Sequence, residues 1–320
     1  MNIKLSAREL TAALFAMLLV GGFCGRARAA TGISACGTLS STGNYFLTSN
    51  LTATGDCLVI HASNVAIDMK GKTITGNGTG AAITDNGIEY DFAIIVNGKI
   101  RNFENGIDLS DSGDAIISNV DSSNNADDGI FINGCCDTLD SVTANSNGAS
   151  GIDISSDDSS LTKIQANGNG NGGIFIAECC NLLVASTANN NTGIGVQIGQ
   201  DDSFVVSSKI QHNSGVGLEM IDDNGVIKSN TSNNGGDGME FTDQTNQVIA
   251  SKSNGNGGTG IDMTGKFGVI SGVQANKNAT GVSMECRGST ASLAAQHNST
   301  SNLVQTVSDG PCANADLKAP

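Results

Sequence analysis

The sequence contains Gly129-Ile130-Phe131-Ile132, which returns as Gly151-Ile152-Asp153-Ile154 and again as Gly173-Ile174-Phe175-Ile176. Nine such units, each a glycine followed by an apolar, a variable and an apolar residue, begin at steps of 21 to 23 residues. Their first residues are Gly106, Gly129, Gly151, Gly173, Gly195, Gly217, Gly238, Gly260 and Gly281. An asparagine stands four residues before the glycine in the first eight units, at Asn102, Asn125, Asn147, Asn169, Asn191, Asn213, Asn234 and Asn256. Self-similarity at a fixed period is the signature of a repeat protein.

An apolar-variable-apolar triplet is typical of a short strand with two residues inward and one outward. One coil cannot bury its inward pair alone, so coils must stack about 4.8 Å apart. The repeat therefore predicts an all-β, single-stranded parallel β-helix of about ten 22-residue coils with capped ends, a rod roughly 50 Å long at that spacing. The repeat asparagines are expected to form a ladder along one turn of the rod.

These repeats resemble the right-handed β-helix (PbH1) repeats of the pectin-lyase-like superfamily, including NosD-type proteins, over about residues 59–305. The resemblance implies a right-handed solenoid. It does not imply one activity, because the superfamily contains polysaccharide lyases, glycosidases, epimerases, phage tailspikes and non-catalytic proteins.

The first 29 residues have the composition of a secretory signal peptide. Lys4 and Arg8 precede an apolar stretch over 10–23, and Ala27-Arg28-Ala29 resembles a cleavage site. We expect an N-terminal cap over 30–58, the β-helix over 59–305, and a C-terminal cap or tail over 306–320. The predicted protein is secreted, to the extracellular space or the periplasm, and has no membrane span.

Net charge limits the choice of partners. Residues 30–320 hold 12 Lys and Arg against 30 Asp and Glu, a formal charge of −18. Nucleic acid, anionic lipid and polyanionic sugars would be repelled unless a cation bridged them. Extracellular polysaccharide is the partner that we expect, and the sequence does not indicate an oligomeric state.

The cysteines are expected at the ends of the rod and in its turns. Export permits disulfides, and we predict Cys36–Cys57 and Cys286–Cys312 as covers for the exposed strand edges; buried free thiols are the alternative. Cys135-Cys136 and Cys179-Cys180 fall at matching turns two coils apart, about 9.6 Å, too far to bridge each other. We interpret them as structural turn residues, with a vicinal disulfide in each pair, or a soft-metal site, as alternatives.

The variable residue of each triplet is expected to face outward and to form a row. Its members are Asp108, Phe131, Asp153, Phe175, Gln197, Glu219, Glu240, Asp262 and Ser283. Glu219, Glu240 and Asp262 are consecutive, so their spacings of about 4.8 and 9.6 Å bracket the carboxylate separations of retaining and inverting glycosidases. They are the candidate catalytic residues. The alternative interpretation is a solvated acidic stripe that keeps the rod soluble.

Acidic turns provide candidate ligands for Ca²⁺, which binds oxygen atoms. The candidates are Asp157, Asp158, Asp201, Asp202 and Asp223, with Asp222 beside the last. Aspartate is also favoured in tight turns without any metal.

Short, uniform repeats without long insertions favour a non-catalytic protein that binds glycans or other partners along the rod, or that serves a structural role. Active sites usually need loops that wall a cleft. The first alternative is a carbohydrate-active enzyme, either a polysaccharide lyase or a glycoside hydrolase, that uses the acidic row. The second is metal handling of the NosD kind.

Overall fold

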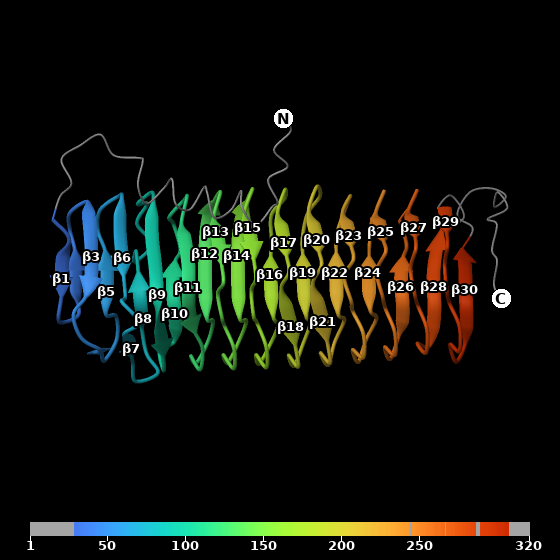
Figure 1. Ribbon diagram of the computed structural model, residues 1–320, viewed down its shortest axis with the longest axis horizontal. Coiled ribbons are helices and arrows are strands. Elements are labelled where there is room, and N and C mark those ends of the chain that lie inside the picture. Colours follow the sequence, from blue (N-terminus) through green and yellow to red (C-terminus); the bar gives the residue numbers. More distant parts are fainter. Residues whose placement is uncertain (1–28, 244, 266, 286–288, 307–320) are drawn as a thin grey trace, which may run out of the picture.

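The structure is a computed structural model that describes residues 29–243, 245–265, 267–285 and 289–306. These residues form a rod of about 12 turns, in which each turn adds one strand to each of two long sheets (Figure 1). Strands of successive turns pair in parallel, and the described residues contain no α-helix. The predicted right-handed parallel β-helix is confirmed.

Sheet A has 15 strands. They are β1 (Thr31–Ile33), β3 (Gly43–Leu47), β4 (Leu51–Thr52), β6 (Val65–Asp68), β7 (Thr73–Thr75), β9 (Ala93–Arg101), β11 (Ile116–Ser122), β13 (Thr138–Asp140), β15 (Ser160–Thr162), β17 (Leu182–Val184), β20 (Phe204–Val206), β23 (Gly225–Ile227), β25 (Gln247–Ile249), β27 (Val269–Ser271) and β29 (Ser289–Ala291).

Sheet B has 13 strands and contains the repeated triplets. They are β2 (Gly37–Leu39), β5 (Leu58–Ile60), β8 (Ala81–Thr84), β10 (Asn105–Leu109), β12 (Ile130–Cys135), β14 (Ile152–Asp157), β16 (Ile174–Ile176), β19 (Val196–Ile198), β22 (Leu218–Met220), β24 (Met239–Phe241), β26 (Thr259–Met263), β28 (Thr280–Glu285) and β30 (Ser301–Thr306). A third, narrower face contains β18 (Thr187–Asn189), β21 (Lys209–Gln211) and isolated bridges.

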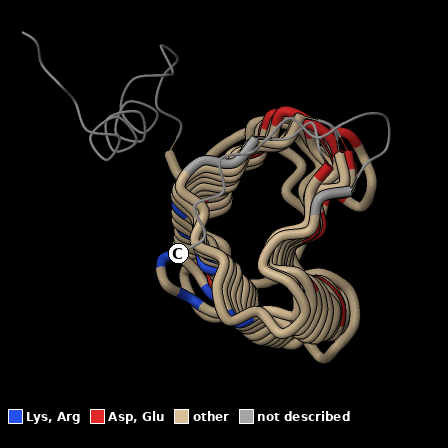
Figure 2. Tube along the Cα trace, turned by 90° about the vertical axis from the view of Figure 1, so that its right-hand side faces the viewer, with Lys and Arg blue, Asp and Glu red and all other residues tan. Residues whose placement is uncertain are grey.

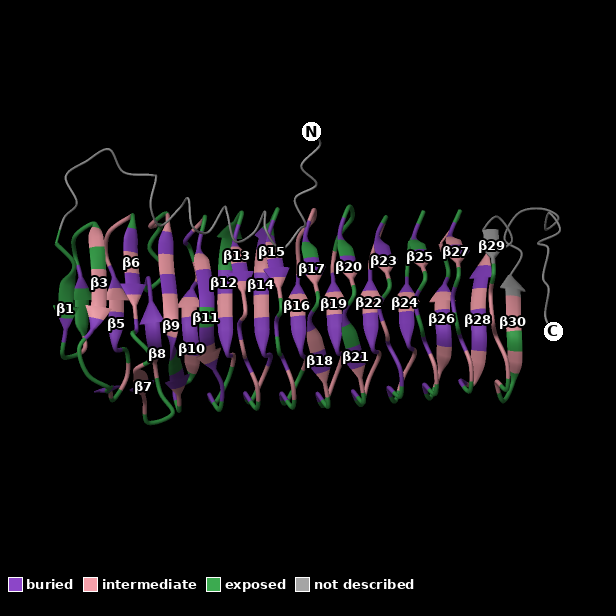
Figure 3. Ribbon diagram, in the orientation of Figure 1, coloured by how far each residue is buried: buried purple, intermediate pink, exposed green. Residues whose placement is uncertain are grey.

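The core is a stack of like residues from successive coils. Ile130 pairs with Ile152, and Ile152 pairs with Ile174, which puts the first apolar residue of each triplet on top of the next. These isoleucines are at most 2% exposed, and buried residues run through the whole interior of the rod (Figure 3). Each coil therefore buries its apolar pair against its neighbours and not within itself.

The rod begins earlier than the predicted boundary at residue 59. Strands β1 to β5 already belong to sheets A and B, so residues 31–58 form coils of the helix where we expected a separate cap. The glycine pattern misses these coils because other small residues take its place. Going back one coil at a time from Gly106, the aligned residues are Ala82, Cys57 and Cys36. The strand pairings of the residues that directly follow them show this alignment.

The asparagines form a buried ladder. From Asn125 to Asn256, the side-chain Oδ1 of each member accepts the backbone N–H of the preceding position in the ladder, at 2.9–3.1 Å. Amide-to-amide bonds from Nδ2 to the next Oδ1 run alongside them, at 2.9–3.2 Å. The ladder continues through Asn278 to Asn298.

Asn102 does not join this ladder, contrary to our prediction. Its side chain is exposed, and its backbone is left-handed, with a φ of 59°. Buried Phe103 occupies the ladder position, because its N–H donates to Asn125 Oδ1 at 3.1 Å. The coil between Phe103 and Asn125 is 22 residues, whereas the spacing of the glycines there is 23, so counting back from Gly106 points to the wrong residue.

Further polar ladders support the other turns. One runs through Asp137, Ser159, Asn181, Ser203, Asn224 and Asn246. Another is built of serines, namely Ser186, Ser208, Ser229 and Ser251. Sequence analysis missed both, because serine and asparagine alternate at one turn and serine is too common to stand out at the other.

Three disulfides are present in the described residues. Cys36 is bonded to Cys57, with their Cα atoms 4.5 Å apart, and so ties the first coils of sheet B together. Cys135–Cys136 and Cys179–Cys180 are vicinal disulfides, the arrangement that we held as an alternative. The predicted pair Cys286–Cys312 lies outside the described residues.

Candidate functional site

The outward residues of sheet B form one unbroken row. Direct pairing joins Asp108 to Phe131, Phe131 to Asp153, and so on along the whole set. Every member from Asp108 to Ser283 is half-buried, so each side chain stands among its neighbours on the sheet and keeps part of its surface open. We call this set the sheet B row; it is Asp108, Phe131, Asp153, Phe175, Gln197, Glu219, Glu240, Asp262 and Ser283.

The three predicted catalytic carboxylates are neighbours in the sheet B row. Glu219 pairs with Glu240, and Glu240 pairs with Asp262. Burial raises the pKa of all three carboxyls, and the charges of Glu219, Asp237 and Asp262 raise the pKa of Glu240 further. The structure therefore places these groups side by side, with a higher proton affinity than solvated carboxyls have.

A second acidic cluster lies at the other end of the sheet B row. Burial raises the pKa of Asp128 and Asp153 to about 6, with further increases from neighbouring aspartates. Burial also raises the pKa of Asp108, and the charge of Asp85 adds to the effect. Sequence analysis missed Asp128 because it precedes the repeat glycine and so lies outside the triplet that we used to define the outward row.

The aromatic members of the sheet B row lie within this second cluster. Phe131 is between Asp108 and Asp153, and Phe175 is between Asp153 and Gln197. Carboxylates and phenyl rings thus alternate over four successive coils. Such a surface offers flat apolar area together with hydrogen-bond acceptors.

Three buried carboxylate oxygens on the sheet B row accept no hydrogen bond: one Oδ1 each from Asp108, Asp153 and Asp262. An unpaired buried acceptor costs free energy unless a ligand or water donates to it. The same row that holds the acids therefore also holds unused acceptor capacity.

Acidic and basic residues separate around the rod. Figure 2 shows Asp and Glu gathered on one side of the cross-section and Lys and Arg on another. The sheet B row contains no Lys or Arg, so no cation of the row itself offsets its carboxylates. A polyanionic ligand would meet repulsion along this face.

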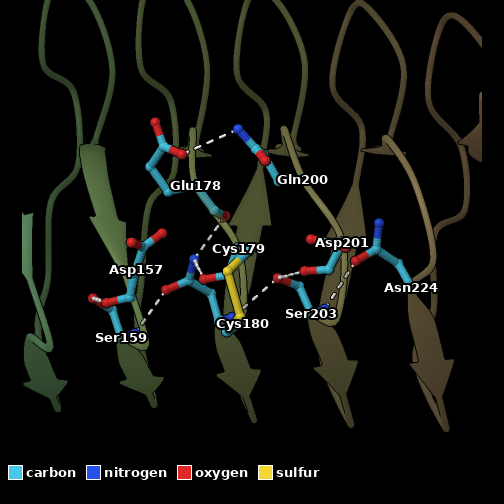
Figure 4. The surroundings of a disulfide bond; sticks show 10 residues. Asp157, Ser159, Glu178, Cys179, Cys180, Gln200, Asp201, Ser203 and Asn224 are labelled. Atoms are coloured by element: carbon cyan, nitrogen blue, oxygen red, sulfur yellow. Dashed lines mark hydrogen bonds between the residues drawn. A yellow bond between two sulfur atoms is a disulfide. The ribbon is translucent and has the colours of Figure 1, made fainter.

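The predicted turn aspartates are not brought together into a metal site. In the part of the chain that the structure describes, no three His, Cys, Asp or Glu side chains are arranged to hold a metal ion. Asp157 and Asp201 lie in alternate coils, with the cysteine pair of the intervening coil between them (Figure 4). Likewise, no helix among the described residues has the length and apolarity needed to cross a bilayer.

Fold and surface together define the class: a right-handed parallel β-helix protein with an extended row of acidic and aromatic side chains on one sheet. Residues 105–226 match the family model described as the right handed beta helix region. No curated protein matches the sequence significantly.

Solved structures share the fold at low sequence identity. ORF18 of Geobacillus virus E2 is 12% identical, with a TM-score of 0.53 over 86% of this chain, which spans 56% of that protein. A variant of the periplasmic alginate epimerase AlgG is 10% identical, with a TM-score of 0.51 over 84% of this chain and 76% of that one. The A-module of the mannuronan C-5 epimerase AlgE6 of Azotobacter vinelandii is 15% identical, with a TM-score of 0.49 over 93% and 94%. The first two of these similarities show a shared fold.

Proposed function

We propose that the protein is an exported, non-catalytic glycan-binding protein whose binding surface is the sheet B row. The observation that carries the proposal is the unbroken register of that row, in which carboxylates and phenyl rings alternate over four successive coils. A linear polymer with a matching repeat makes the same pair of contacts, one with a carboxylate and one with a ring, twice over these coils. Export is supported by the predicted signal peptide and by the disulfide Cys36–Cys57.

The chemistry of the row favours a neutral polysaccharide. Sugar rings present C–H faces that pack on Phe131 and Phe175, and their hydroxyl groups donate to carboxylates in strong, charge-assisted hydrogen bonds. Asp108 and Asp153 flank Phe131 along the row, and both side chains keep part of their surface open to such a ligand. The carboxylates of a uronate polymer would find no Lys or Arg in the sheet B row to pair with.

A glycan array tests the proposal. We expect binding to neutral polysaccharides and little binding to uronate polymers at physiological ionic strength. Addition of Ca²⁺ should not be required for the neutral ligands. Binding confined to uronates, or no binding at all, would contradict the proposal.

The raised pKa values of Glu219, Glu240 and Asp262 favour a second candidate function, glycan cleavage at these three residues. General acid catalysis needs a carboxyl that is protonated near the working pH. Glu240→Gln separates the two functions, because Glu240 lies between the other two acids. Under the proposed function, neither the wild type nor Glu240→Gln releases cleavage products from a glycan. The variant is then slightly more stable than the wild type, since one repelling charge is gone. A cleaving activity that Glu240→Gln abolishes, with unchanged thermal unfolding, would establish the enzyme.

A further inference from the structure

The two vicinal disulfides occupy equivalent turns but differ in their surroundings. Cys135 aligns with Asp157 of the next coil, and Cys179 lies at the same turn one coil further on. A bond between adjacent residues closes almost no loop, so it adds little to stability through the entropy of the unfolded chain. Cys36–Cys57 closes a separation of 21 residues and therefore does restrict the unfolded chain.

Cys135 and Cys136 are the more accessible pair. Both are exposed, whereas Cys179 and Cys180 are half-buried. Gly134 takes the place that Glu178 takes before the second pair, and the Glu178 side chain there is held by Gln200, whose Nε2 donates to it at 3.1 Å (Figure 4). An external thiol therefore meets less cover at Cys135–Cys136.

The residue after each pair also differs, and it belongs to the same turn ladder. Asn181 Oδ1 accepts the N–H of Ser159 at 2.8 Å, and Asp137 Oδ1 accepts the N–H of Ala115 at 2.8 Å. Asn181 Nδ2 then donates to the carbonyls of Glu178 and Cys179, at 2.8 and 2.7 Å. The turn around the second disulfide is thus closed by an amide.

Asp137 cannot close its turn in this way when it is ionised. Its side chain is fully buried, and its Oδ2, the counterpart of the Asn181 Nδ2, makes no hydrogen bond. Burial raises its pKa to about 6, an effect that the Ser156 hydroxyl opposes and the charge of Asp114 increases. Asp157 and Asp158 lie in the same turn of the next coil, where Asp157 pairs with Cys135. A protonated Asp137 donates where Asn181 does, whereas an ionised Asp137 puts a negative charge directly after the disulfide.

We propose that Cys135–Cys136 is a thiol–disulfide exchange site for external thiols, with Asp137 as its positioning residue, and that Cys179–Cys180 is its structural counterpart. An external dithiol is the reductant. One of its thiolates bonds to a sulfur of the pair, the Cys135–Cys136 bond breaks, and the displaced cysteine leaves as a thiolate that takes a proton from solvent. The second thiol of the reductant, after losing its proton, displaces the other cysteine, which is protonated in turn. The products are an oxidised dithiol and two cysteine thiols. This activity is independent of glycan binding.

Ionisation of Asp137 opposes the exchange, because its charge disfavours the departing thiolate. Reduction by dithiothreitol, followed by alkylation and mass mapping, gives the rate at each vicinal pair within one molecule. The ratio of the two rates cancels the pH dependence of the reagent. We expect Cys135–Cys136 to be reduced faster than Cys179–Cys180. The rate at Cys135–Cys136 divided by the rate at Cys179–Cys180 should be about tenfold larger at pH 5 than at pH 7.5.

Asp137→Asn is the decisive variant, because asparagine occupies the equivalent ladder position in three other coils, at Asn181, Asn224 and Asn246. The ratio should then no longer change with pH, while the unfolding midpoint stays close to that of the wild type. In Asn181→Asp, the rate at Cys179–Cys180 should acquire the pH dependence. Equal rates at the two pairs at both pH values, or the same pH dependence in Asp137→Asn as in the wild type, would overturn the proposal. Mass mapping that finds Cys135 and Cys136 as free thiols in the oxidised protein would also overturn it.

Discussion

Asn169→Ala is expected to lower the free energy of unfolding by about 2–4 kcal/mol, since buried donors are left unpaired. Asn169 is fully buried, and its Oδ1 accepts both the backbone N–H and the Nδ2 of Asn147, at 2.9 and 3.2 Å. Its own Nδ2 donates to Asn191 at 3.1 Å. Alanine removes all three bonds from the middle of the ladder, and water cannot replace them without opening the coils.

Asn171→Ala is the matched control. Asn171 lies two residues away in the same turn, but its side chain is exposed. Chemical denaturation of both variants measures the difference, which we expect to leave Asn171→Ala within about 0.5 kcal/mol of the wild type. Equal midpoints for the two variants would contradict the role given to the ladder.

Gly173→Ala is expected to destabilise the rod by about 3 kcal/mol through overpacking. A Cβ at Gly173 would lie 2.4 Å from the backbone oxygen of Gly195 and 2.7 Å from Asn191 Nδ2. Both atoms belong to the next coil, and both are fixed, one by the backbone and the other by the ladder. The repeat glycine is therefore required by the close approach of the ladder asparagine.

Gly113→Ala provides the comparison, because the nearest atom to its added Cβ is 3.8 Å away. Thermal unfolding should show a large loss for Gly173→Ala and almost none for Gly113→Ala. A small effect at both positions would mean that coils can move apart enough to admit a methyl group, and the packing argument would fail.

The sequence predicted those parts of the fold that repeat with the same residues. Gly173 and Asn169 recur because a close contact and a buried amide tolerate few substitutes, so their spacing revealed the coil. The coils over 31–58 stayed hidden, because Cys36 and Cys57 stand where the repeat has glycine, in coils that precede the first ladder asparagine, Asn125.

The candidate site was predictable only in part. The sheet B row followed from the alternation in each triplet, because the direction of a side chain in a strand is fixed by its position. Asp128 and Asp137 were missed, since their burial depends on how turns of successive coils stack. The vicinal disulfides were left open for a similar reason: the state of adjacent cysteines depends on the turn that holds them.

Affinity measurements on one neutral glycan from the array test the central claim most directly. Phe131→Ala/Phe175→Ala removes both rings from the sheet B row, and Phe204→Ala removes an exposed ring, 45% accessible, from sheet A. We predict that the double variant binds about tenfold more weakly or worse, because each ring contact contributes roughly 0.5–1.5 kcal/mol, and that Phe204→Ala binds like the wild type. Wild-type affinity in the double variant, with its fold intact, or an equal loss in Phe204→Ala, would contradict the assignment of the binding surface to sheet B.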